Sequence, residues 1–420
     1  MTSRATADQR DAAQSQRAEL TFKYNLAAGR HGWLRLTPAY SVKIVDSILS
    51  TAESAAVVLD PFSGTATTPL CAAMRGHSAV SVEINPFLAW FGQAKIARYS
   101  PDTILAARDR GSEVSRLAID EGAAAASPPP IHNIDRWWTE QRLAYLCRLK
   151  AGLDGLAAQP RPVRDLLAVA FCRTLIRLSN AAFNHQSMSF KPAEAHRPQL
   201  ELWNDEREDV DYFGEDLEYI LDSASHNPPG DAAVVLGDAR TVGESLDRQF
   251  DLLVTSPPYP NRMSYIRELR PYMYWLGYLE QSRDAGELDW RAIGGTWGIA
   301  TSRLAEWRKS PDAFIPGYVD ELIECIASSD TKSGRILGNY VGKYFDDIWQ
   351  HLTSVRRLMK PGAAVHYIVG NSKFYSVVVP TERIYRDMLT EAGFQRAEIH
   401  AIRKRNSKKE LLEFDVRAIV

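Results

Sequence analysis

Short apolar runs alternate with segments of helical periodicity along most of the chain. The apolar runs have the length of buried strands, and Gly, Pro and small polar residues separate them from the helical segments. Because strands that alternate with helices form parallel sheets, this order predicts an α/β fold with a doubly wound, mainly parallel sheet. The predicted strands are 55–60, 78–83, 233–238, 250–255, 364–369, 396–402 and 414–420, and predicted helices include 41–50, 344–359 and 381–392.

The last two predicted strands, 396–402 and 414–420, are separated by only a short polar segment. A parallel pair needs a long crossover connection, whereas an antiparallel pair needs only a tight one. We therefore expect a C-terminal β-hairpin at one edge of the sheet.

Two stretches interrupt this alternation and divide the chain. Residues 96–230 are mostly helical and are expected to form a large helical insert. Residues 280–335 are rich in Trp, Gly and Arg and are expected to form a second, irregular insert. The sheet-forming domain then consists of 21–95 and 231–420, preceded by a polar leader at 1–20.

The composition is that of an ordinary globular protein, with 45% hydrophobic and 24% charged residues and a formal charge of -2. These values exclude collagen-like, disordered and disulfide-scaffold proteins. The sequence has no run of about 18 apolar residues that would span a membrane, and its polar start resembles neither a signal nor a transit peptide. Four scattered cysteines without a CxxC pair predict reduced thiols and no metal site. We expect a cytoplasmic protein.

A turn of small residues follows Asp60, which ends the first predicted strand. Gly64, Thr65 and Ala66 let the backbone approach a ligand closely, and open α/β sheets bind ligands beyond the carboxyl ends of their strands. Glu83 ends the next strand about 20 residues later, the spacing at which an acidic residue binds ribose hydroxyls in dinucleotide-binding units.

The chemistry of this turn favours a ligand other than a pyrophosphate. The GxGxxG pattern and a phosphate-binding lysine are both missing. Asp60 would repel a phosphate, but it suits the cationic amino-acid end of S-adenosylmethionine. An ordinary tight strand-to-helix turn is the alternative for this segment taken alone.

A second rigid segment, Thr255-Ser-Pro-Pro-Tyr259, follows the strand at 250–255. Its two prolines remove two backbone donors and hold the chain extended, which leaves carbonyl oxygens as acceptors. The Ser256 hydroxyl and the Pro257 carbonyl could each accept one N–H of a planar amino group, and Tyr259 could stack on its ring. A merely rigid strand exit is the alternative here.

Together, Asp60-Pro-Phe-Ser-Gly-Thr-Ala-Thr67 and Thr255-Ser-Pro-Pro-Tyr259 resemble the S-adenosylmethionine-dependent amino-group DNA methyltransferases. The form with Ser before Pro-Pro-Tyr is most similar to the cytosine-N4 enzymes, whereas adenine-N6 enzymes more often have Asp or Asn there. The resemblance implies a class I methyltransferase, Rossmann-like catalytic domain, with S-adenosylmethionine as cofactor and double-stranded DNA as partner. The region Trp33–Ser41 is similar to the family's additional cofactor motif, and Asp238 is expected to meet the adenine amino group.

The resemblance assigns roles to individual residues of this sequence. The expected catalytic residues are Ser256, Pro257, Pro258 and Tyr259. The expected cofactor-binding residues are Pro38, Tyr40, Asp60, Pro61, Phe62, Gly64, Thr65, Ala66, Glu83, Ile84, Asp238, Ala239 and Ser256. Ala66 stands where the family commonly has Gly, and we expect this change to be tolerated with a negative φ.

The expected reaction is methylation of an exocyclic amine on a flipped-out base. Cytosine N4 is a poor nucleophile, because its lone pair is delocalised into the ring. Hydrogen bonds from its two N–H groups to Ser256 and Pro257 would favour a pyramidal nitrogen, aligned in line with the methyl group. Adenine-N6 methylation, RNA or protein-amide methylation, and a non-catalytic nucleic-acid-binding module remain alternatives.

Basic residues are the candidates for contacts with DNA phosphates. Residues 131–200 hold ten Lys and Arg against five Asp and Glu, and 201–222 hold ten acidic residues and one Arg. The helical insert is therefore the candidate DNA-recognition domain, with the acidic segment on its far side or acting as a DNA-mimicking cover. The candidates in the insert are Arg136, Arg142, Arg148, Arg164, Arg173 and Arg177. The other candidates for binding nucleic acid are Arg262, Arg267, Arg403, Lys404, Arg405 and Lys408. Asn184 and Gln186 could read base edges, or their segment could be a loop that folds over the cofactor site. A cognate restriction or defence partner is possible, and the oligomeric state is open.

Overall fold

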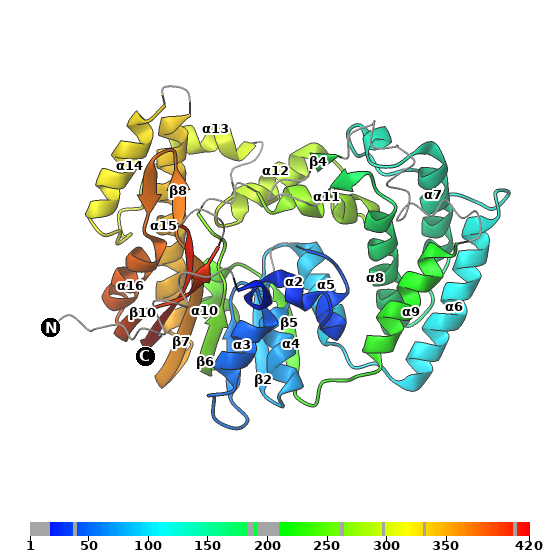
Figure 1. Ribbon diagram of the computed structural model, residues 1–420, viewed down its shortest axis with the longest axis horizontal. Coiled ribbons are helices and arrows are strands. Elements are labelled where there is room, and N and C mark those ends of the chain that lie inside the picture. The colour runs from blue at the N-terminus through cyan, green and yellow to red at the C-terminus, as the bar shows by residue number, and fades with distance from the viewer. Residues whose placement is uncertain are drawn as a thin grey trace.

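The computed structural model describes residues 17–36, 40–182, 189–190, 210–260, 264–295, 299–330, 333–405 and 410–420. A seven-stranded sheet forms its centre, in the order β10-β11-β7-β6-β1-β2-β5 (Figure 1). The strands are β1 Val57–Asp60, β2 Ser78–Glu83, β5 Ala232–Leu236, β6 Phe250–Thr255, β7 Met359–Gly370, β10 Gln395–Lys404 and β11 Leu412–Ile419. All seven predicted strands lie in this sheet.

The strands from β7 to β5 are parallel, while β11 pairs antiparallel with both β7 and β10. Neighbouring residues of the central strands face opposite sides, as the two-residue period of a strand requires. Val58 of β1 packs with the helices α3 Val42–Leu49 and α4 Thr67–Met74. Leu59 packs with α15 Gly334–Arg356 and α16 Thr381–Glu391 on the other face. The predictions of a doubly wound α/β fold and a C-terminal edge hairpin are confirmed.

Short elements connect or flank these layers. Helix α5 Pro86–Ile96 follows β2, and its Ala89 and Ile96 pack with Leu70 and Val234. The further short elements are η1 Ala18–Leu20, α2 Phe22–Asn25, η2 Gly29–Gly32, η6 Ala239–Thr241, α10 Val242–Ser245, β8 Ser372–Phe374 and β9 Val377–Val379.

The helical insert stands beside the sheet, to the right in Figure 1. It shares one apolar core with α5 and with α11 Ile266–Trp275, the helix that follows the second motif. Trp275 of α11 meets Trp138 and Phe171 edge to face, with ring centroids 5.8 and 5.6 Å apart. The insert is therefore packed onto the segment that leaves β6. Its elements are α6 Pro101–Ile119, η3 Ile134–Arg136, α7 Glu140–Asp154, α8 Arg161–Arg177, β3 Ala181–Ala182, β4 Ser189–Phe190 and α9 Tyr212–Ala224.

The prediction of an irregular insert at 280–335 is wrong, because three helices lie there. They are α12 Ser282–Arg291, α13 Ile299–Glu306 and α14 Tyr318–Ser328, and α15 begins at Gly334 rather than at residue 344. Glycines at 334, 338 and 342 weaken the helical signal of the sequence. Tertiary contacts require them, since a Cβ on Gly342 would lie 2.7 Å from the Trp307 ring and one on Gly334 only 2.4 Å from a backbone oxygen.

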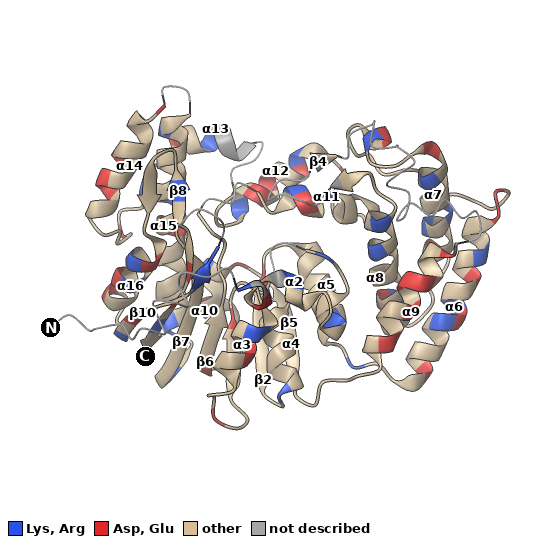
Figure 2. Ribbon diagram, in the orientation of Figure 1, with Lys and Arg blue, Asp and Glu red and all other residues tan. Residues whose placement is uncertain are grey.

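The acidic segment and the basic helix α8 neutralise each other inside the insert. Asp216 of α9 accepts a hydrogen bond from Arg173 of α8 at 2.9 Å, and Glu215 pairs with Arg177 at 2.6 Å. Figure 2 shows these charges on the adjacent helices. The described part of the acidic segment thus holds the insert together. Arg173 and Arg177 are engaged within the protein, so the expectation that they contact phosphates is not supported.

The described residues include no helix that is long and apolar enough to cross a membrane.

We expect Asp216→Ala to destabilise the protein by about 3 kcal/mol, since it removes the buried partner of charged Arg173. Asp216 is 4% exposed and also accepts a hydrogen bond from Thr174. The matched control, Glu215→Ala, removes an exposed ion pair and should cost less than about 1 kcal/mol. Denaturant unfolding of both variants measures the difference. Equal losses would show that burial of Asp216 contributes nothing to the insert.

Candidate active site

The two motifs meet where the strand order of the sheet reverses. From β1, the chain adds β2 and β5 on one side and then β6 and β7 on the other, so β1 and β6 are neighbours. Open α/β sheets bind ligands beyond the carboxyl ends of the strands at such a point. Asp60 ends β1 and Thr255 ends β6, and the Thr255 hydroxyl donates a hydrogen bond of 2.6 Å to Asp60 Oδ1. This buried bond joins the first motif to the second.

Glu83 at the end of β2 holds the turn that follows Asp60. Its Oε2 accepts a hydrogen bond of 2.7 Å from the Gly64 amide, and its Oε1 accepts one of 2.9 Å from the Asn85 amide. On the far side of the turn, Lys95 of α5 donates to the Thr65 carbonyl at 2.5 Å. Burial lowers the pKa of Lys95 to about 7. The turn is thus fixed by an acidic and a basic side chain before any ligand binds.

The expectation of a negative φ at Ala66 is wrong. Ala66 is left-handed, with φ 56° and ψ 41°, and directly precedes α4. This conformation costs an alanine roughly 1 kcal/mol because its Cβ approaches the following carbonyl. The family's usual glycine therefore matches the backbone that this chain adopts with Ala66.

One oxygen of Asp60 is buried with no hydrogen-bond partner in the described part of the chain. The residue is 1% exposed, and its Oδ1 accepts hydrogen bonds from Thr255 and from the Phe62 amide. Its Oδ2 has no hydrogen-bond partner among the described residues. Burial raises the pKa of Asp60 to about 6, although the Thr255 hydrogen bond opposes this shift. Burial also raises the pKa of Glu83 to about 7. A cationic donor beside Asp60 Oδ2 would remove the unfavourable burial of this oxygen.

The other expected cofactor residues surround this turn to different degrees. Tyr40 is buried, and its hydroxyl is hydrogen-bonded to the Thr68 hydroxyl on α4. The Phe62 ring contacts His351 edge to face, and His351 donates through Nδ1 to the Ala239 carbonyl at 3.0 Å. Pro61 is buried and Ile84 is half-buried, whereas Pro38 lies outside the described residues.

Asp238 follows β5 and is held by Arg240. Arg240 binds the Asp238 carboxylate at 2.6 Å and also reaches Asp347 of α15 at 3.0 Å. Burial would raise the pKa of Asp238, but the Arg240 guanidinium holds it below its usual range. A carboxylate that stays ionised suits an amino group as its ligand.

Hydrogen bonds to neighbouring elements hold the Ser-Pro-Pro-Tyr segment in place. The Ser256 hydroxyl donates to the Ile368 carbonyl of β7 at 3.0 Å. Because this bond uses its hydrogen, Ser256 Oγ retains its lone pairs as acceptors. Tyr344 of α15 donates to the Pro258 carbonyl at 2.7 Å, while the Pro257 carbonyl has no hydrogen-bond partner in the described parts of the chain.

Two arginines of the densest basic run, Arg403 and Arg405, contact the protein itself rather than solvent alone. Arg403 of β10 donates to Glu413 of β11 at 2.7 Å. The Arg405 guanidinium lies 4.5 Å from the centre of the Tyr259 ring. The prediction that Arg403 and Arg405 serve as phosphate contacts is therefore not supported by their geometry.

The remaining nucleic-acid candidates differ in how freely they face solvent, and Arg136 and Arg164 of the insert are exposed. Arg267 is exposed on α11, and Lys404 is half-buried on β10, with no ion pair among the described residues. Within the insert, Arg142 and Arg148 donate to backbone carbonyls, at 3.4 and 2.7 Å. Candidates outside the described residues are Arg262, Lys408, Asn184 and Gln186.

The sequence did not reveal the side chains that support the site. Glu413, Tyr344 and His351 lie more than 85 positions from the residues of the site that they contact. Only Thr255 could be found from the sequence, because it directly precedes Ser256 in the second motif. The others belong to ordinary amphipathic helices or strands, where nothing distinguishes them from residues of the core.

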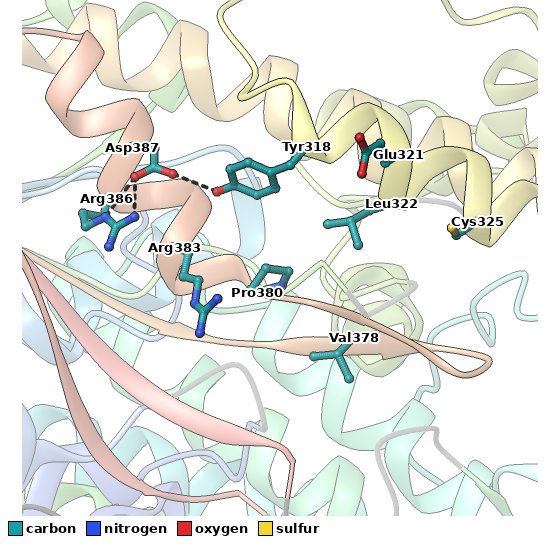
Figure 3. Close-up of a pocket in the computed structure, with 9 residues that line it drawn as sticks. All are labelled: Tyr318, Glu321, Leu322, Cys325, Val378, Pro380, Arg383, Arg386 and Asp387. Atoms are coloured by element: carbon teal, nitrogen blue, oxygen red, sulfur yellow. Dashed lines mark hydrogen bonds and ion pairs between the residues drawn. The ribbon is translucent and has the colours of Figure 1, made fainter.

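A separate cavity lies between α14 and α16, away from the carboxyl ends of β1 and β6 (Figure 3). None of the expected site residues lines it. Asp387 on its wall accepts hydrogen bonds from both Tyr318 and Arg386, so this carboxylate is already paired. The candidate site is therefore the junction of the two motifs.

No protein-family model matches the sequence. The chain is 21% identical over 406 residues to the type II methyltransferase M.MvaI of Kocuria varians, which covers 91% of this chain and 82% of that protein. It is 20% identical over 448 residues to the type II methyltransferase M.BsoBI of Geobacillus stearothermophilus, covering 93% and 84% respectively. The similarity spans most of this chain and is not confined to the two motifs.

We expect Asp60→Asn to stabilise the unliganded protein at pH 8. The pKa of Asp60 is higher in the folded chain, about 6, than its ordinary value of 3.8. Its ionisation therefore opposes folding, and the stability present at low pH is lost as the pH rises through about 6. The difference between the two pKa values corresponds to about 3 kcal/mol at pH 8 and to almost nothing near pH 3.

Denaturant unfolding of wild type and Asp60→Asn at several pH values tests this prediction. The matched control is Asp231→Asn, at a residue directly before β5 whose side chain is exposed to water. This control should not reproduce the pH-dependent gain in stability, because its carboxylate keeps its hydration in the folded chain. An Asp60→Asn variant that is less stable than wild type at pH 8 would contradict the prediction.

Proposed function

We propose that this protein is a DNA methyltransferase that transfers a methyl group from S-adenosylmethionine to N4 of a flipped-out cytosine. The observation that carries this proposal is the Thr255–Asp60 hydrogen bond, which places the acidic turn beside Ser256. The similarity to two type II methyltransferases supports DNA methylation. The Ser before Pro-Pro-Tyr supports cytosine N4 over adenine N6.

The cofactor fits the polar groups that surround the turn. The buried Asp60 Oδ2 lacks a partner among the described residues and would accept a hydrogen bond from the cofactor's ammonium group. Glu83 would accept from the ribose hydroxyls, and Asp238 from the adenine amino group. When bound, S-adenosylmethionine supplies a methyl group on a positively charged sulfur.

The amine of the base would be held on the β6 side of the junction. The Ser256 hydroxyl donates to the Ile368 carbonyl, so only its acceptor lone pairs are available to a substrate. The Pro257 carbonyl is the second acceptor. Two acceptors matched to two N–H groups orient the nitrogen lone pair and favour the pyramidal geometry of the transition state.

Double-stranded DNA is the proposed partner, with its target base flipped out into this site. Arg267 on α11 and Lys404 on β10 are described candidates for phosphate contacts. We further propose that the protein acts in the cytoplasm together with a restriction or defence partner.

Product analysis tests the proposed function. Unmethylated DNA is incubated with the pure protein and labelled S-adenosylmethionine, then digested to nucleosides and separated. We expect labelled N4-methylcytosine. Labelled N6-methyladenine would support methylation of an exocyclic amine but would overturn the assignment of cytosine as the target base. Label in RNA or protein instead of DNA would overturn the substrate, and no transfer would favour a binding module.

We expect Ser256→Ala to lower kcat by about a hundredfold or more, the effect of removing one preorganised group from a transition state. The Kd for S-adenosylmethionine should change little, because Asp60 and Glu83 remain. Rapid-quench kinetics and calorimetry measure the two quantities. Ser245→Ala, at an exposed position at the end of α10, is the matched control. Full activity of the Ser256→Ala variant would show that the serine takes no part in the reaction.

A further inference from the structure

We propose that the C-terminal hairpin positions the catalytic tyrosine, with Glu413, Arg403 and Arg405 as positioning residues. The inference rests on the proposed function and deepens it. It also gives Arg403 and Arg405 a role that is different from binding phosphate.

The first contact is a hydrogen bond between the hairpin and the ring hydroxyl. Tyr259 donates to Glu413 Oε1 at 2.7 Å, although the two residues are 154 positions apart. Glu413 is 3% exposed, so water does not compete for this bond. Burial raises the pKa of Tyr259, which keeps its hydroxyl protonated and able to donate.

The second contact is an ion pair that offsets the cost of burying the Glu413 carboxylate. Arg403 donates from Nε to Oε2 at 2.7 Å and from its terminal nitrogen to Oε1 at 3.3 Å. A buried carboxylate needs both an opposite charge and hydrogen bonds. The Arg403 side chain is itself only 13% exposed. Removing Arg403 to bind a phosphate would leave Glu413 unpaired beside Tyr259.

The third contact covers one face of the tyrosine ring. Arg405 is held over the ring by a hydrogen bond of 2.8 Å from its Nη1 to the Asn371 carbonyl. A Cβ at Gly370 would lie 2.5 Å from the same Nη1, so a side chain at this position would displace Arg405. A guanidinium over an aromatic ring is an attractive arrangement. With Arg405 on one face, a flat base can stack only on the opposite face.

The main chain of the tyrosine is held separately from its ring. The Tyr259 amide donates to the Tyr265 hydroxyl at 3.1 Å, and Tyr344 binds the preceding carbonyl. The hairpin in turn is tied to the end of β7, because Asn371 accepts a hydrogen bond from the Leu412 amide. Main-chain contacts thus place Tyr259, and the hairpin sets the plane of its ring.

A double-mutant cycle tests this coupling. Tyr259→Phe removes only the hydroxyl, and Glu413→Gln keeps an acceptor of similar size while removing the charge. We expect each variant to slow single-turnover methyl transfer by about tenfold or more, with cofactor Kd unchanged, because misplacement affects the reacting geometry. The double variant should be no slower than the slower single variant, since both changes act on one contact, the charge-assisted hydrogen bond between the two side chains. Glu398→Gln, on the exposed side of β10, is the matched control. Additive losses would overturn the proposal.

The salt dependence of DNA binding separates positioning from phosphate contact. Loss of one phosphate contact lowers the slope of log K against log salt by about one. We expect Arg405→Gln to slow transfer while leaving this slope unchanged, and Arg405→Lys to restore part of the rate. Lys404→Gln, one residue away, should lower the slope. A lower slope for the Arg405→Gln variant would show that Arg405 contacts a DNA phosphate and would overturn its positioning role.

A crystal structure of Glu413→Gln decides the matter independently of activity. We expect the Tyr259 ring to leave the position it occupies under Arg405, while the main chain of the Ser-Pro-Pro-Tyr segment stays in place. An unchanged ring would overturn the proposal. If the wild-type protein transfers no methyl group to DNA, the proposed function fails, yet the ring position still decides whether the hairpin positions Tyr259.

Discussion

The hydrogen bond from Thr255 to Asp60 is the contact on which the site depends. It joins residues 195 positions apart, and it exists because β1 and β6 are neighbours at the reversal of the strand order. The bond uses one oxygen of a buried carboxylate and leaves the other without a partner among the described residues. A buried oxygen without a hydrogen bond destabilises the unliganded protein, and the same oxygen could accept a hydrogen bond from a cationic ligand. Stability and ligand binding thus make opposite demands on the same side chain.

Charge in this protein serves mainly to hold segments of the chain together. The basic helix α8 meets the acidic helix α9, Arg240 joins Asp238 to Asp347, and Arg403 neutralises Glu413. In each case at least one carboxylate is largely buried, and a buried carboxylate requires a cationic partner. Counting basic residues along the sequence therefore overestimates the surface that is available to DNA. The described residues that keep exposed or unpaired charge, such as Arg267 and Lys404, are fewer than the sequence suggests.

The proposed chemistry needs a rigid acceptor site more than it needs a strong base. Prolines remove the backbone donors of the Ser-Pro-Pro-Tyr segment, and contacts from β7, α15 and Tyr265, the residue before α11, hold that segment from three directions. The segment after it leads into α11, whose Trp275 is part of the core of the helical insert. The insert is thereby coupled mechanically to the site, which suits a part of the protein that is proposed to recognise DNA. The helices of the insert and α11 cannot move independently without breaking this core.

The sequence by itself determined the α/β fold, the seven strands and the two motifs, because hydrophobic periodicity and turn residues act over a few neighbouring positions. The start of α15 was missed because Gly334, Gly338 and Gly342 weaken the local helical signal, and packing against Trp307 and neighbouring backbone explains these glycines. The left-handed Ala66 was also missed, since its conformation is imposed by the turn rather than by its own preference. The supports of Tyr259 were decided by the tertiary structure alone. Glu413 and Arg405 come from a hairpin more than a hundred residues away, and no local pattern encodes which face of a strand meets a distant ring.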